Sequence, residues 1–71
     1  MTDYVYKSVE ITGTSPAGVT EAIARAIAKA SETLRNLDWF EVVEVRGNIR
    51  DSKVANYQVT LKLGLRYEPK A

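Results

Sequence analysis

Residues 55–67 constrain the fold of this chain more than any other segment, because apolar and polar side chains alternate along almost their whole length. Such alternation is the period of a β-strand with one face turned toward a core. The apolar row holds Ala55, Tyr57, Val59, Leu61, Leu63, Leu65 and Tyr67, and the polar row holds Asn56, Gln58, Thr60, Lys62 and Arg66. The length of the apolar row predicts that this segment is the central strand of a sheet.

Two further segments have the character of strands. Tyr4–Thr12 alternates, with Lys7 as the exception on the apolar side, and Trp39–Ile49 is apolar on both sides. In the second segment Phe40 and Val42 are expected to point one way and Val43, Val45 and Ile49 the other. A strand that is apolar on both faces is normally covered on both. Since a single helix covers only one side of a sheet, we expect the second cover to be another chain.

Between these two strands, apolar residues recur every three or four positions, which predicts an amphipathic helix of about 20 residues. The recurring residues are Val19, Ala22, Ile23, Ala26, Ile27, Ala30, Leu34 and Leu37. Ser15 before Pro16 is a helix-start signal, because a serine hydroxyl can cap free amides and proline tolerates the first helical position. Asn36 is a residue type that adopts the left-handed conformation with which many helices end. The alanines should let the helix lie close against the sheet.

The predicted fold class is therefore α+β, a single strand–helix–strand–strand domain over residues 1–71 with a polar loop at residues 50–53. The helix returns the chain, so the first two strands run in the same direction and the third runs against them. A three-stranded antiparallel sheet of order 1-3-2 buries the longest apolar row in its centre. This order leaves the first and second strands as edges, where subunits can pair.

Composition narrows the possible functions. A chain of 71 residues buries only about 60% of its extended surface, and such small domains usually need disulfides, a metal or partner subunits. The chain contains no cysteine and no histidine, so we expect no metal site and favour association between copies. A net charge of +1 argues against nucleic-acid binding. No apolar run reaches 18 residues and the N-terminus does not resemble a signal peptide, so we expect a cytoplasmic protein without a membrane span.

The side chains favour binding over catalysis. Neither a cysteine nucleophile nor a histidine base is present, and Glu41 and Glu44 are spaced to point to opposite faces of a strand. Trp39 is the only tryptophan, and its indole can stack on a planar ligand. Gln58 can read the edge of a heterocycle, and Arg46 can hold a phosphate. From periodicity alone, Trp39 as a core or interface residue and the other two as surface residues remain open alternatives.

Four motifs, taken in their order and spacing, help to decide between these interpretations of Trp39, Gln58 and Arg46. They are GTSPAGV, LDWFEV, RGNI and YQVTLKLGLRYE. From about Tyr6 to Glu68 they resemble the dodecins, small flavin-binding proteins of bacteria and archaea. The resemblance implies a hollow shell of twelve identical subunits, with pairs of FMN or riboflavin molecules sandwiched between two copies of Trp39. It also implies that Gln58 hydrogen-bonds the isoalloxazine edge and that Arg46 lies near the phosphate-bearing chain.

Some members of this family also bind coenzyme A, and the resemblance makes Lys29, Arg35 and Arg66 the candidate residues for that ligand. The function it implies is flavin storage or sequestration without turnover. Two alternatives belong to other classes. One is a small flavin-dependent oxidoreductase, and the other is an assembly or coenzyme A-binding module in which Trp39 only joins subunits.

Overall fold

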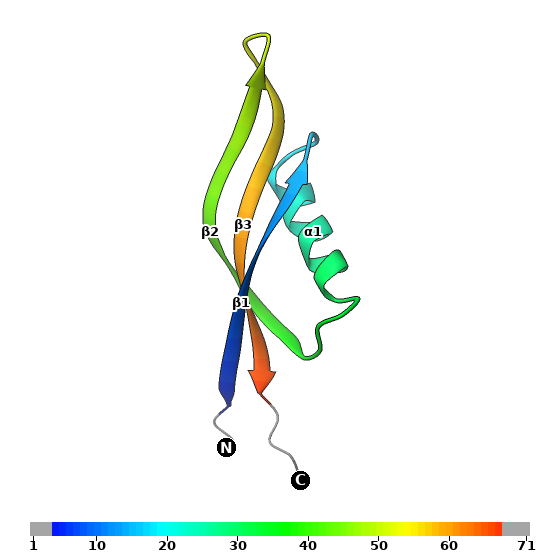
Figure 1. Ribbon diagram of the computed structural model, residues 1–71, viewed down its shortest axis with the longest axis vertical. Helices are drawn as coiled ribbons and strands as arrows, with labels where there is room; N and C mark the ends of the chain where they lie inside the picture. Colours follow the sequence, from blue (N-terminus) through cyan, green and yellow to red (C-terminus); the bar gives the residue numbers. More distant parts are fainter. Residues whose placement is uncertain (1–3, 68–71) are drawn as a thin grey trace.

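The computed structural model describes residues 4–67. It contains β1 (Val5–Ser15), α1 (Val19–Ala30), β2 (Leu37–Arg50) and β3 (Lys53–Tyr67), in the predicted order along the chain. The strands form one antiparallel sheet of order β1-β3-β2, with α1 on one side of it (Figure 1). Among the described residues, no helix is long and apolar enough to cross a membrane.

The core lies between α1 and the central strand. Val59, Leu61 and Leu63 of the predicted apolar row are buried, and they pack against Ala22, Ala26 and Ala30 of the helix. The helix also approaches β1 closely, since a Cβ added at Gly13 would collide with the carbonyl oxygen of Ala22 and the Cβ of Ala26. The prediction that alanines bring the helix close to the sheet is therefore confirmed.

The helix is shorter than predicted, with 12 residues. Leu34 and Leu37 continue the helical spacing, but Leu34 packs against the core from the loop and Leu37 from the start of β2. An apolar residue that reaches the core from a loop cannot be distinguished from a helical one by spacing alone. Asn36 does adopt the left-handed conformation, with φ of 61°, but it precedes β2 and lies six residues beyond the end of α1.

Ser15 does not cap the helix as predicted. It is the last residue of β1 and is buried, and its Oγ accepts a hydrogen bond from the backbone N–H of Ala17 at 3.0 Å. The residue that precedes the helix is Gly18, which makes no side-chain cap. Ser15 therefore stabilises the turn that leads into the helix.

The predicted orientation of side chains along β2 is wrong beyond Val42, because the strand contains a β-bulge. Val42 pairs with Leu61, but the next paired residue is Glu44, so Val43 has no partner of its own. One extra residue reverses the alternation. As a result Val45 pairs with Val59 and lies on the same face as Phe40 and Val42. The prediction that Glu41 and Glu44 point to opposite faces is wrong for the same reason, since their partners Lys62 and Thr60 lie on one face of β3.

The helix does not cover β2. Phe40, Val42 and Val45, which we call the open row, lie on the helix side of the sheet but remain 47%, 41% and 51% exposed. They belong to a long hairpin with a two-residue turn at Asp51 and Ser52, which extends past the helix in Figure 1. Beyond the edge of α1, the sheet thus presents apolar side chains that this chain alone leaves exposed.

Candidate functional site

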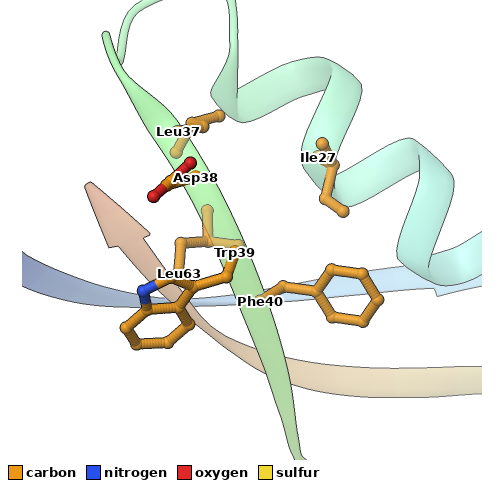
Figure 2. A pocket seen from close by; sticks show the side chains of 6 residues that line it. All are labelled: Ile27, Leu37, Asp38, Trp39, Phe40 and Leu63. Carbon is orange, nitrogen blue, oxygen red and sulfur yellow. The ribbon is translucent and has the colours of Figure 1, made fainter. Parts of the chain in front are cut away.

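Trp39 lies on the sheet face that is turned away from α1. It pairs with Gly64 of β3, and side chains directly opposite each other in an antiparallel pair share a face. We call this side of the sheet the outer face; on β3 it carries Asn56, Gln58, Thr60, Lys62, Gly64 and Arg66. Phe40 follows directly in the chain and points to the helix side, as Figure 2 shows.

Gly64 provides the surface on which the indole rests. A Cβ at this position would collide with indole atoms Cδ2, Cε2 and Cζ2 of Trp39. The ring therefore lies directly over the backbone of β3, and Trp39 is still 39% exposed. One side of the indole is held by protein while the other is open. A glycine inside a strand often marks a place where another group approaches the backbone closely. Gly64 is therefore a signal in the sequence for the Trp39 contact, and the apolar–polar alternation of residues 55–67 does not reveal it.

Tyr6 contacts the indole from the side, and Asp38 in turn binds Tyr6. The ring of Tyr6 meets Trp39 edge to face, with centroids 5.8 Å apart and planes at 61°. The hydroxyl of Tyr6 donates a hydrogen bond to Oδ2 of Asp38 at 2.9 Å. This bond is the largest cause of a Tyr6 pKa above its usual 10.0, because the carboxylate stabilises the protonated phenol. The sequence placed Tyr6 on a strand but gave no reason to connect it with Trp39.

Gln58 and Arg46 also lie on the outer face, and they are direct cross-strand partners. Thr14 pairs with Gln58 from the other side, so Gln58 lies between a threonine and an arginine in the sheet. Gln58 is six residues from Gly64 along β3, which at roughly 3.3 Å per residue is about 20 Å. A single three-ring heterocycle is too short to touch both Trp39 and Gln58 of one chain. The structure thus brings Gln58 and Arg46 together but leaves Trp39 apart from them.

The three residues predicted for coenzyme A do not meet within one chain. Lys29 is on the helix, where it forms an exposed ion pair with Glu32 at 3.6 Å. Arg35 is exposed in the segment between α1 and β2. Arg66 is on β3, on the outer face, with its guanidinium 5.2 Å from the ring centroid of Tyr4. Their shared role stays a prediction.

A shallow hollow of about 130 Å³ opens between α1 and β2. Figure 2 shows its lining residues, with Ile27 descending from the helix and Phe40 reaching toward it from the strand. The lining is apolar except for Asp38. This hollow marks where the helix fails to seal against β2, and its lining carries no combination of groups for acid–base chemistry. Within residues 4–67, no three Asp or Glu side chains gather in a way that would hold a metal ion.

Comparison with known proteins gives a consistent result. A family model described as Dodecin matches residues 5–68. The dodecin of Thermus thermophilus is 55% identical over 64 residues, which are 90% of this chain and 93% of that protein. The structure of dodecin from Streptomyces coelicolor superposes with a TM-score of 0.89 at 53% identity, over 99% of this chain and 100% of that one. Dodecin from Streptomyces davaonensis superposes with a TM-score of 0.88 at 51% identity, over 96% of this chain and 100% of that one.

Proposed function

The chain belongs to the dodecin family, and from this premise we propose that it binds flavins, FMN or riboflavin, without a covalent bond and stores them. The observation that carries the proposal is the indole of Trp39, which rests on Gly64 with its other face open. Planar aromatic systems attract each other in offset stacks. The flat isoalloxazine ring matches this open plate in shape and chemistry.

The distance between Trp39 and Gln58 indicates how many chains form one site. Because about 20 Å of strand separates them, one flavin can touch both only if they come from different chains. We propose a twofold axis at this surface, since such an axis brings one patch against its own copy. Two copies of Trp39 would then enclose a pair of flavins. Gln58 would hydrogen-bond the polar edge of the ring, and Arg46 beside it would hold the phosphate of FMN.

The open row supports an assembly larger than a dimer. Phe40, Val42 and Val45 face the helix side, so a twofold contact on the outer face leaves them exposed. Further copies must cover this second surface, and a closed shell of twelve chains does so on every subunit. Since small secreted domains are usually rich in disulfides and this chain has no cysteine, the location we propose is the cytoplasm.

Storage requires binding and shielding, not turnover. The flavin itself supplies the light-driven chemistry, and an indole in face contact is a good electron donor to an excited flavin. Trp39 should therefore quench the fluorescence of the bound ring and suppress its photochemistry. The chain has no cysteine and no histidine, so neither group is available for covalent or general-base catalysis on a substrate.

The test is a fluorescence titration of FMN with the protein and with Trp39→Ala. The wild type should quench FMN saturably at micromolar concentration. The variant should bind about 10- to 100-fold more weakly, which corresponds to the loss of one stacking contact. Tyr67→Ala removes an exposed aromatic ring from the helix side of the sheet and should behave as wild type. Unchanged quenching by Trp39→Ala would refute stacking on this residue.

A further inference from the structure

We propose that Tyr6, anchored by Asp38, is a positioning residue that fixes the plane of the Trp39 indole on Gly64. This inference rests on the proposed function, because it assigns the residues that hold the Trp39 indole in the orientation on which the flavin would stack. It concerns three side chains and one backbone, which come from all three strands of the sheet.

An indole on an edge strand needs such a device. Trp39 is on β2, which lies at the edge of the sheet and has no cover from α1. Gly64 limits how deep the ring can sink toward the sheet but exerts no sideways force. A contact from the side is needed to stop the ring from turning about its side-chain bonds. Tyr6 is placed for this contact, since its ring meets the indole at 61°.

An irregularity at the start of β2 allows Tyr6 to contact two consecutive residues of this strand, Asp38 and Trp39. Leu37 pairs with Leu65 and Trp39 with Gly64, so Asp38 falls at a register shift and has no cross-strand partner of its own. Consecutive residues of a regular strand point to opposite faces, and a bulge redirects one of them. Tyr6 contacts Asp38 through its hydroxyl and Trp39 through its ring. The aspartate therefore fixes the tyrosine ring, and the ring fixes the indole.

Tyr6 also contacts a second aromatic ring, that of Tyr4. The ring of Tyr4 meets that of Tyr6 with centroids 6.4 Å apart and planes at 62°. The guanidinium of Arg66 lies 5.2 Å from the centroid of Tyr4, within the range of cation–π attraction. Tyr6 thus lies between a supported ring and the indole, and its hydroxyl ties this row of rings to β2.

The experiment uses the emission of Trp39, which needs no ligand and reports on one position because the chain has one tryptophan. Excitation at the red edge of the indole band suppresses energy transfer between copies of Trp39 in the assembly. Time-resolved anisotropy of the wild type should decay only with the tumbling of the whole assembly. Tyr6→Phe and Asp38→Ala should each add a fast component from local motion of the indole. Asp38→Asn retains an acceptor oxygen and should restore most of the rigidity. Tyr57→Phe, a control on the helix side opposite Gly47, should match the wild type.

A parallel FMN titration separates this inference from the proposed function. Tyr6→Phe should weaken FMN binding about fivefold, the effect of one hydrogen bond. A fast component in both Tyr6→Phe and Asp38→Ala confirms the positioning role even if the wild type binds no FMN, a result that would remove flavin as the ligand. Unchanged anisotropy in both variants overturns the positioning role, while Trp39-dependent FMN binding would still support the proposed function.

Discussion

β2 and β3 are neighbours in one sheet and carry similar apolar residues, yet their environments are opposite. Leu61 of β3 is fully buried, whereas Val42, its direct partner on β2, is 41% exposed. The difference is caused by the helix, which packs over β1 and β3 but does not cover Val42 and the rest of the open row on β2. A single chain therefore buries the apolar row of its central strand but leaves the apolar row of β2 partly exposed. Trp39 lies on this incomplete strand, so the candidate site and the missing cover are features of the same element.

The largest effect should come from a charge in the open row. Val42→Asp would place a carboxylate where we propose that another chain packs, and burying an unpaired charge is costly. We expect loss of the assembly and, with it, loss of cooperative folding, measured by sedimentation and by circular dichroism. Val42→Thr has nearly the same shape without the charge and should remain assembled. A folded, monomeric Val42→Asp would show that β2 needs no cover.

A smaller but substantial effect is expected on the covered strand. Leu61→Ala removes a fully buried side chain and should lower the free energy of unfolding by about 3 kcal/mol, through lost burial and a cavity. Thr60→Ala, on the outer face next to it, removes a hydroxyl that shares a hydrogen bond with Thr12 and should lower that free energy by only about 1 kcal/mol. Chemical denaturation of the assembled protein measures both. Equal losses would mean that the outer face is as tightly packed as the core.

A third prediction separates Gln58 from Trp39 within the candidate site. Gln58→Ala should weaken FMN binding about fivefold, since one neutral hydrogen bond contributes about 1 kcal/mol. The flavin that still binds should be quenched as in the wild type, because quenching depends on the indole. Titrations to saturation distinguish the two quantities. Loss of quenching at saturation in Gln58→Ala would contradict this division of roles.

The smallest effect is the pH dependence of the Tyr6 contact. The hydrogen bond to Asp38 raises the pKa of Tyr6 above 10.0 in the folded protein, so the neutral phenol is favoured on folding. The stabilisation is then fully present below pH 10 and is lost as the pH rises through the folded pKa. A phenolate absorbance titration of the wild type minus that of Tyr6→Phe isolates this group. Asp38→Ala should lower the pKa toward 10.0, and an unchanged value would contradict the bond.

The sequence predicted the element order, the strand order and the buried row of β3, because the alternation of residues 55–67 reports directly on burial. It placed Gln58 on the polar side of that strand for the same reason. The reversal at Val43 was out of reach, since a bulge depends on pairing between strands and not on local pattern. The end of the helix at Ala30 was missed because Leu34 and Leu37 serve the core from outside it.

Contacts between distant segments were also beyond the sequence. The partnership of Tyr6 with Asp38 joins residues of β1 and β2 that lie on either side of β3. The contact of the Trp39 indole with Gly64 likewise depends on the pairing register of β2 with β3. Composition and spacing identify which side chains can bind a ligand, but only the paired sheet shows which of them meet.

The central claim is that each chain carries half of a core and half of a flavin site. Sedimentation velocity of the purified protein with FMN, followed at the flavin absorbance, tests it most directly. We expect the flavin to sediment with a species of twelve chains of 7.9 kDa each, about 95 kDa in total. Flavin that sediments with a single folded chain would contradict this claim, as would an assembled protein that leaves the flavin free in solution.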